Sequence, residues 1–365
     1  MDVETKLNIA IRNAAEVITR EDLTKIISEV ERPRGYIGFE PSGLVHLGWL
    51  VWMFKVRDLV DIGVDFYILE ATWHALINDK LGGDIDLIRK AARYTREVLQ
   101  AIGVEPSRVH FVDAEELVSD KDYWGTLVKI AKKTSLARVR RTLTIMGRTS
   151  DEAETDFSKL VYPLMQVTDI FYLKLDIALG GLDQRKAHML ARDLAERLGF
   201  AKPVAIHTPI ISSLHGPAKK KPPAGQDVEV DELVAEAKMS KSKPETAIFI
   251  HDQPSEIKSK VLEAYCPPRI VEFNPIIEIN RHILFQQPGF KLHVERPSAH
   301  GGPIDISSAR ELEELYAQGK IHPLDLKNAT AESLVKFLGE VQKRLFSSSE
   351  AVSLLEELSK AKVTR

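Results

Sequence analysis

Residues 36–49, Y-I-G-F-E-P-S-G-L-V-H-L-G-W, decide the expected fold. Their first four residues are a short apolar run, which is typical of a strand buried on both faces. Residues 41–43, Pro-Ser-Gly, end that strand in a turn. Apolar residues return at helical spacing from Val45 onward, with Arg57 and Asp58 expected to face outward. The stretch therefore predicts a strand, a glycine-containing turn and a helix start.

This predicted helix start is suited to an anion. The first turn of a helix offers free backbone N–H groups and the positive end of the helix dipole, which favour phosphate. His46 and Gly48 fall in that turn, and Gly43 precedes it. Because glycine has no side chain, a bulky ligand can lie against the backbone at both positions. The alternative is an ordinary strand–helix connection with one surface histidine.

A basic run far down the chain favours the first interpretation. Residues 238–243 read K-M-S-K-S-K, which in isolation is more often a disordered linker. Together, P-x-G-x-x-H-x-G at residues 41–48 and K-M-S-K-S resemble the two signatures of class I aminoacyl-tRNA synthetases, in that family's order and separation. The pair is much more specific than either member.

Composition excludes several classes of protein but does not identify the function. The 365 residues are 44% hydrophobic and 28% charged, as in an ordinary globular protein, and their number suggests two domains. A net charge of −3 gives no overall basic field, so an RNA partner would need local basic patches. Cys266 is the single cysteine, which excludes a disulfide framework and a multi-cysteine zinc site, and no protein-held metal is expected. Without a long apolar span or signal peptide, a cytoplasmic protein is expected.

Strands and helices are predicted to alternate along the first half of the chain. The expected elements are helices at 3–17 and 19–30, strands at 36–39, 66–69 and 109–112, and a helix at 86–102. Residues 71–75 are interpreted as a strand end and loop, which makes His74 either a site residue or a half-buried histidine. This alternation predicts a Rossmann-like, doubly wound parallel sheet, with ligands at the carboxyl ends of its strands.

Two further segments carry polar groups. Residues 121–148 form a predicted basic helical region, either a solvated face or a surface for the phosphates of an RNA stem. Tyr162, Gln166 and Asp169 share one face of an otherwise apolar helix, which favours a polar pocket. A strand at 175–179 and a glycine turn then precede the helix at 185–198, and Asp183 in that turn is placed to accept hydrogen bonds from a ribose.

The second half changes in character. Residues 217–237, rich in glycine, proline, lysine and acidic residues, are expected to be a mobile insertion. Short helices follow, with a strand pair near 291–295. The predicted division is a Rossmann-type domain at 1–212 with a helical insertion at 113–165, a mobile loop at 213–250 that carries K-M-S-K-S, and a helical domain at 251–365. The resemblance to class I synthetases implies that the insertion serves the acceptor stem and the dimer contact, and that the last domain binds the anticodon.

Four stretches now resemble one family closely. They are Y-I-G-F-E-P-S-G, Y-P-L-M-Q-V-x-D-I, G-G-L-D-Q-R-K and H-P-L-D-L-K-N, and they follow the order of tyrosyl-tRNA synthetases of the archaeal and eukaryotic type. The resemblance runs from about Thr5 to Phe346. It implies a homodimer that uses ATP and Mg²⁺ to form tyrosyl-adenylate and then transfers L-tyrosine to tRNA(Tyr). Neither step needs a protein nucleophile, so catalysis would be positioning and charge stabilisation.

The resemblance also implies roles for residues. Phosphate chemistry would fall to His46, Ser240, Lys238 and Lys241. The phenolic hydroxyl of tyrosine would meet Tyr36 and Asp169, and its amino end would meet Tyr162, Gln166 and Gln184. ATP would contact Gly38, Pro41, Gly43, His46, Gly48, Gly181, Asp183 and Met239. The tRNA would contact Arg140, Arg141, Arg185, Lys186 and Met189 at the acceptor stem, and His300 and Asp325 at the anticodon.

Two departures from the family and three rival assignments remain. The first departure is the segment at 217–237, which the family's shortest members lack. The family signature ends in a second histidine, but this chain has Trp49, whose indole has no acceptor and no charge. The rivals are a tryptophanyl-tRNA synthetase, a small-molecule adenylate-forming ligase or nucleotidyltransferase on the same fold, and an inactive RNA-binding paralogue. Asp169 beside Tyr36 argues against the first, and the helical C-terminal region argues against the second. The intact His46 and the lysines of 238–243 argue against the third.

Overall fold

A computed structural model describes residues 1–147, 156–217, 238–241 and 243–361. Most of the predicted insertion, residues 218–237, lies outside the described residues, and so does the side chain of His300.

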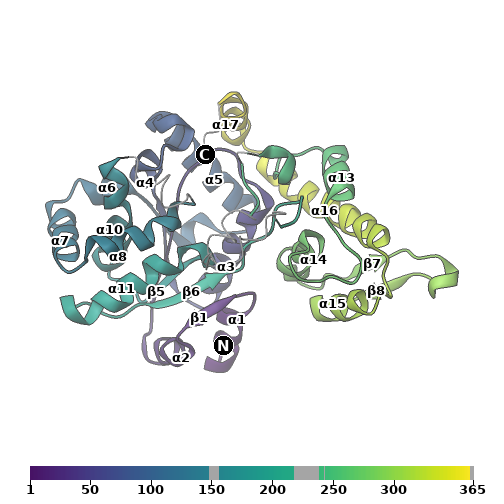
Figure 1. The fold of residues 1–365 in the computed structure, drawn as a ribbon, viewed down its shortest axis with the longest axis horizontal. Helices are drawn as coiled ribbons and strands as arrows, with labels where there is room; N and C mark the ends of the chain where they lie inside the picture. The colour runs from purple at the N-terminus through teal and green to yellow at the C-terminus, as the bar shows by residue number, and fades with distance from the viewer. Residues whose placement is uncertain (148–155, 218–237, 242, 362–365) are drawn as a thin grey trace.

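One mixed sheet organises the larger part of the molecule (Figure 1). Its spatial order is β1-β6-β5-β2-β3-β4, and all neighbours are parallel except β1, which runs antiparallel to β6. The strands are β1 (Glu16–Ile18), β2 (Arg34–Phe39), β3 (Asp65–Glu70), β4 (Val109–Asp113), β5 (Ile177–Gly181) and β6 (Val204–Thr208). The predicted doubly wound fold is confirmed, and the strand order reverses between β2 and β5, where such sheets open a crevice for ligands.

Helices cover both faces of this sheet. They are α1 (Val3–Ile11), α2 (Arg20–Glu29), α3 (Leu50–Asp61), α4 (Thr72–Ile77), α5 (Ile85–Ala101), α6 (Ala114–Val118), α7 (Lys121–Lys132), α8 (Leu136–Thr142), α10 (Phe157–Tyr172) and α11 (Arg185–Leu198). Alternate residues of β2 enter different cores, because side chains of a strand point to opposite faces. Ile37 packs in the core that holds α3 and α5, whereas Tyr36 packs in the core that holds α7, α10 and α11.

The C-terminal third is mainly helical, as predicted. It contains α13 (Pro254–Glu263), α14 (Pro275–His282), α15 (Ala309–Ala317), α16 (Pro323–Leu345), α17 (Ser349–Lys360) and the hairpin β7 (Leu292–Val294) with β8 (Ile304–Ile306). Figure 1 places α15 and the hairpin at the end of the molecule opposite α7. The helices α16 and α17 pack against α5, and one continuous apolar core joins them to α3.

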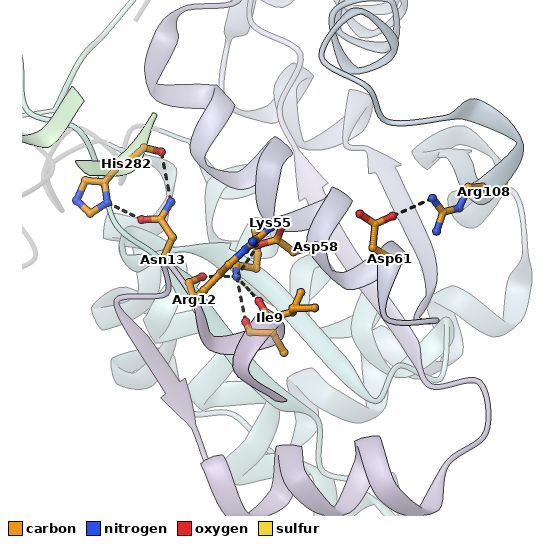
Figure 2. A network of polar contacts seen from close by, with 9 residues as sticks. Ile9, Arg12, Asn13, Lys55, Asp58, Asp61, Arg108 and His282 are labelled. Atoms are coloured by element: carbon orange, nitrogen blue, oxygen red, sulfur yellow. Dashed lines mark hydrogen bonds and ion pairs between the residues drawn. The ribbon is translucent and has the colours of Figure 1, made fainter. Parts of the chain in front are cut away.

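A buried cation fixes the N-terminal segment to α3 (Figure 2). Lys55 is 1% exposed, and its Nζ donates to the backbone oxygens of Ile9 (3.2 Å), Ala10 (3.1 Å) and Arg12. It also pairs with Asp58 at 3.1 Å, and Arg12 pairs with the same carboxylate. These carbonyls lie at the C-terminal end of α1, where a cation is electrostatically favoured. The buried charge of Lys55 is thus fully partnered, as burial requires.

Two sequence predictions fail in this region. Asp58 was expected to face outward, but it is 4% exposed because Lys55 and Arg12 need its charge. The predicted helix at 3–17 ends at Ile11, because Asn13 adopts a left-handed backbone conformation (φ 52°) and Glu16–Ile18 pairs with the free edge of β6. In addition, the Asn13 side chain exchanges hydrogen bonds with His282 of α14, at 3.3 and 2.6 Å (Figure 2), so this bend joins two distant parts of the chain.

Three other boundaries differ from expectation. Residues 71–75, predicted as a loop, largely form α4, which continues directly from β3. The predicted strand at 175–179 lies two residues later, as β5 at Ile177–Gly181. The basic region at 121–148 is not one helix: α7 ends at Lys132, and Ser135 caps the separate helix α8 by accepting from the N–H of Arg138 at 3.3 Å.

Candidate active site

The glycine turn after β2 places His46 four residues before the start of α3. Gly43 adopts φ 106°, a conformation that L-residues with side chains rarely reach. A short 3₁₀ turn (Leu47–Trp49) then precedes α3, and His46 caps it by accepting from the N–H of Gly48 through Nδ1 at 3.1 Å. An accepting Nδ1 carries no proton, so in the neutral ring Nε2 carries it and is a donor. Burial, followed by the charges of Lys241 and Lys238, holds the pKa of His46 well below its ordinary value.

The segment that follows the basic run lies directly against this turn. Leu47 donates its backbone N–H to the oxygen of Ile248 at 2.7 Å, and Ile250 donates to Val45 at 3.1 Å. Upstream, Met239 is buried and donates to the oxygen of Ile211 at 3.1 Å. These bonds bring both family signatures together, although about 190 residues separate them in sequence.

The two lysines of the basic run have different surroundings. Lys238 pairs with Asp183 at 2.9 Å, and the charge of that carboxylate raises the pKa of Lys238. Lys241 is 7% exposed, and its Nζ lies 3.1 Å from the Oγ of Ser42. Burial, followed by the charge of Lys80, lowers the pKa of Lys241 well below its usual value. Ser240 lies half-buried between them.

A small cavity of about 20 Å³ lies between β2, α4 and α10, beside the turn. Its lining residues are Tyr36, Gly38, Glu40, Ala71, His74, Tyr162, Gln166, Asp169 and Gln184. All five residues predicted for tyrosine are therefore brought to one place. The face of α10 that carries three of them is buried, as the helical spacing predicted.

One end of the cavity is built around Asp169. Its Oδ1 accepts from the hydroxyl of Tyr123 at 2.8 Å. Its Oδ2 is buried without a hydrogen bond from the described residues, since His74 Nε2, 3.3 Å away, is not aligned to donate one. Burial, followed by the charge of Asp169, raises the pKa of Tyr36, so that its hydroxyl keeps its proton. This end holds a free acceptor beside a phenol that can donate.

The other end is built from amides and Tyr162. Gln166 donates from Nε2 to Oε1 of Gln184 at 3.2 Å, and Gln184 in turn donates to the backbone oxygen of Ile145 at 3.0 Å. The Oε1 of Gln166 is buried and has no hydrogen-bond partner among the described residues. Burial and the neighbouring Glu40 raise the pKa of Tyr162. This end offers acceptors and a carboxylate, which suit an ammonium group.

Glycines allow close approach at two points of the crevice. A Cβ on Gly38 would lie 2.7 Å from the hydroxyl of Tyr36, and a Cβ on Gly181 would lie 2.6 Å from Oδ1 of Asp183. A side chain at either glycine would therefore collide with the side chain of Tyr36 or of Asp183 in its present position. Pro41 is buried in the turn, so these residues predicted for ATP lie along β2, the turn and the end of β5. Met239, also predicted for ATP, lies in the basic run against the turn, where a Cβ on Gly48 would be 3.9 Å from the Cβ of Met239.

The residues predicted for the acceptor stem lie on two neighbouring helices. Arg140 and Arg141 are exposed on α8, and Arg185, Lys186 and Met189 lie in the first two turns of α11. An ion pair between Arg138 and Asp193 links the two helices. Arg185 is oriented by Glu16, whose carboxylate accepts from its Nε at 2.9 Å. Asp325 lies in the first turn of α16, in the C-terminal third of the chain.

Sequence reasoning missed two lining residues, Glu40 and Ala71, and left a third lining residue open; it also missed Tyr123, which hydrogen-bonds Asp169. Tyr123 comes from α7, 46 residues before Asp169, and nothing in its sequence context points to the cavity. Glu40 directly follows β2, and Ala71 directly follows β3. Their positions at the carboxyl ends of parallel strands could have marked both as candidate site residues, because ligands bind at that edge of such a sheet. His74, left open between two interpretations, lines the cavity. Among the described residues, no group of three or more metal-binding side chains is arranged to hold an ion.

Comparison with known proteins identifies the family. A family model described as tRNA synthetases class I (W and Y) matches residues 28–339. A tyrosine–tRNA ligase of Aeropyrum pernix is 58% identical over 365 residues, covering 100% of this chain and 99% of the relative. The chain belongs to the tyrosine–tRNA ligases. It is therefore an enzyme of class I, a family that activates its amino acid with ATP.

Solved structures of tyrosine–tRNA ligases share this fold. The tyrosyl-tRNA synthetase of Pyrococcus horikoshii, solved in complex with L-tyrosine, is 39% identical with a TM-score of 0.87, and the match covers 98% of this chain and 100% of that one. A tryptophanyl-tRNA synthetase of Aeropyrum pernix is only 18% identical, with a TM-score of 0.64 over 95% of this chain and 85% of that one. The rival assignment to tryptophan is thus the more distant one. No helix among the described residues is long and apolar enough to span a bilayer.

Proposed function

We propose that the cavity binds L-tyrosine along its length, and that ATP binds beside it over the glycine turn. The observation that carries this proposal is a pair of buried acceptors that receive no hydrogen bond from the described residues: Oδ2 of Asp169 at one end and Oε1 of Gln166 at the other. A buried acceptor without a donor is costly, so a ligand that donates at both ends is favoured. Tyrosine has a phenolic O–H and an ammonium group at its two ends.

The phenol is held from two sides in this proposal. Its O–H donates to Asp169, and its oxygen accepts from the hydroxyl of Tyr36. The ammonium group meets Gln166, Tyr162 and Gln184, with Glu40 adding negative charge. The free volume of the cavity is about that of one water molecule, so the lining side chains must move apart when tyrosine enters.

ATP lies over the backbone of Gly38, Gly43, Gly48 and Gly181 in this proposal, with Pro41 and Met239 packing beneath it. Asp183 accepts from the ribose, which requires Lys238 to leave its present partner and turn toward phosphate. Because the described residues offer no ready metal cage, Mg²⁺ enters with the phosphates of ATP as part of the substrate.

Catalysis follows from positioned charge. The tyrosine carboxylate attacks the α-phosphate, and pyrophosphate leaves. Charge builds on the phosphate oxygens as it does so, and His46 with Ser240, Lys238 and Lys241 can donate to them. The adenylate then passes tyrosine to the terminal ribose of tRNA(Tyr).

Pyrophosphate exchange without tRNA tests this assignment. Purified enzyme should catalyse exchange between ATP and labelled pyrophosphate with tyrosine, and at least 100-fold more slowly with tryptophan or phenylalanine, because neither can donate a hydroxyl to Asp169. Equal rates with tyrosine and phenylalanine would contradict the proposed role of the Asp169 end of the cavity.

The tRNA is proposed to contact the enzyme at two distant places. Its acceptor stem meets Arg140 and Arg141 of α8 and the first turns of α11, and its anticodon meets His300 and Asp325. A carboxylate can accept from the Watson–Crick edge of an unstacked guanine, and a ring can stack on it. This assigns residues 1–212 to catalysis, with 113–165 as the acceptor-stem insertion, 213–250 to the segment that carries K-M-S-K-S, and 251–365 to the anticodon.

Replacing Arg185 should separate the two steps of the reaction. Arg185→Ala should raise the KM for tRNA in aminoacylation about tenfold, the worth of one charged contact, and leave pyrophosphate exchange unchanged. Arg197→Ala, an exposed arginine at the other end of α11, is the matched control and should change neither rate. An equal loss in both assays would place Arg185 in the activation step instead.

The proposed homodimer uses the outer face of α7. Trp124 and Val128, one turn apart, are 45% and 62% exposed, and Figure 1 shows α7 at the edge of the molecule away from the C-terminal helices. Large apolar side chains exposed together are typical of a protein interface.

Val128→Glu should convert this dimer to monomers in sedimentation velocity at micromolar concentration, since a charge would be buried at its centre. Val3→Glu, at an exposed valine of α1, should leave the dimer intact. A dimer that survives Val128→Glu would place the interface elsewhere.

A further inference from the structure

Trp49 replaces the second histidine of the family signature, and its partly buried ring lies in an aromatic cluster. Phe39 contacts it edge-on with ring centroids 5.7 Å apart, and Trp52 lies at 5.9 Å. The Nζ of Lys241 lies only 3.5 Å from the centroid of the Trp49 ring, so the ammonium sits on its face. This contact joins the two signatures directly through their side chains.

Lys241 has few other partners for its charge. Its Nζ lies 3.1 Å from the Oγ of Ser42 and 3.5 Å from the oxygen of Gly43, and it forms no ion pair with a carboxylate of the described residues. Burying an ammonium is costly unless its charge is compensated. The face of an indole is the best aromatic partner for a cation, and it is strongest when water is excluded.

We propose that Trp49 is a positioning residue: its indole face is a platform that docks Lys241 over the glycine turn, where the ammonium converges with His46 and Lys238. The inference rests on the proposed function of Lys241 in stabilising phosphate charge. It gives a physical reason for the departure at this position, because a histidine offers a poorer ring face and, when protonated, repels lysine. The ring of His46 lies 6.3 Å from that of Trp49, so the docked charge stays beside the proposed phosphate donor.

A competing role for the indole is stacking on adenine. The face that holds Lys241 cannot stack on a base at the same time. The two roles therefore differ in kinetics: a platform for Lys241 affects the rate of adenylate formation, whereas a stacking surface affects the KM for ATP.

A double-mutant cycle in pyrophosphate exchange tests the platform. Trp49→Leu should lower kcat about tenfold, and Trp49→Phe, which keeps a ring, only about threefold. Lys241→Met should lower kcat by itself. In the Lys241→Met background, Trp49→Leu should cost less than about twofold, because the partner of the ring is already gone. The KM for tyrosine should stay constant in all of these variants.

Trp52→Phe is the matched control, since it removes an indole from the same aromatic cluster without touching Lys241, and it should leave kcat unchanged. Should Trp49→Leu fail to fold, Trp49→Phe carries the same cycle. Additive losses, a rise in kcat, or a raised KM for ATP at constant kcat would each overturn the platform. If Lys241→Met has full activity, the proposed function of Lys241 fails, and the platform fails with it. If Lys241→Met loses activity but shows no coupling to Trp49, the platform alone is overturned.

Discussion

Replacing His46 by alanine is expected to slow formation of tyrosyl-adenylate about 100- to 1,000-fold, the range found when one pre-organised donor to a developing oxyanion is removed. Tyrosine binding should be unchanged, because His46 does not line the cavity. Single-turnover formation of the adenylate and equilibrium dialysis with tyrosine measure the two quantities separately.

The structure specifies which nitrogen of His46 acts. Nδ1 accepts from the N–H of Gly48, so Nε2 carries the proton that can be donated. Glutamine places its amide nitrogen near the position of Nε2, whereas asparagine places it near Nδ1. His46→Gln should therefore recover about tenfold over alanine, and His46→Asn should not.

The pH dependence gives an independent check. The pKa of His46 is lowered, so the folded enzyme keeps this ring neutral on both sides of the ordinary histidine pKa. Titration of His46 should therefore not limit the wild-type rate near pH 6.5. The pH profiles of the wild type and of His46→Gln should have the same shape in that range. His293→Ala, at an exposed histidine of β7, controls for loss of a histidine elsewhere. Full activity in His46→Ala would remove this residue from the activation step.

Replacing Asp169 by asparagine is expected to lower kcat/KM for tyrosine about 10- to 100-fold in pyrophosphate exchange, which is the worth of a hydrogen bond to a charged acceptor. With phenylalanine the same change should matter little, because phenylalanine has no hydroxyl to donate. The ratio of kcat/KM for tyrosine to kcat/KM for phenylalanine should therefore also fall about 10- to 100-fold.

The network around Asp169 provides the controls for this prediction. Tyr123→Phe removes the donor to Oδ1 but keeps the charge and the free Oδ2, so it should reduce the discrimination much less than Asp169→Asn. Tyr36→Phe removes the donor to the phenolic oxygen and should cost about tenfold with tyrosine alone. If Asp169→Asn slows both substrates equally, then Asp169 stabilises the site without recognising the hydroxyl.

Local patterns in the sequence were sufficient for much of the fold. The apolar run of β2 and the glycine turn that follows it predicted a strand and then a helix, and both are present. The predicted free N–H groups are not: α3 begins only at Leu50, and the N–H groups of the preceding 3₁₀ turn (Leu47–Trp49) already donate to Ile248 and His46. The spacing of Tyr162, Gln166 and Asp169 predicted one buried polar face of α10, because residues three and four apart lie together on a helix. Such signals survive in a single sequence because they depend on neighbours in the chain.

Other features depend on partners that are distant in sequence. The helix predicted at 3–17 ends early because Asn13 binds His282 and Glu16–Ile18 finds an open edge on β6. Asp58 turns inward because Arg12 and Lys55 surround it. Each of these choices is made by a contact that spans more than 40 residues or by burial of a charge, and neither is visible in a local pattern.

The sequence by itself determined the two signatures, the alternation of strands and helices, and the polar face of α10. Only the tertiary structure decided that Tyr123 completes the Asp169 end of the cavity, that Lys238 pairs with Asp183, and that Lys241 rests on Trp49. The physical reason is that a side chain's partner is set by where the sheet and its crossovers bring it. A buried charge is then compensated by the acceptor or aromatic face that lies next to it.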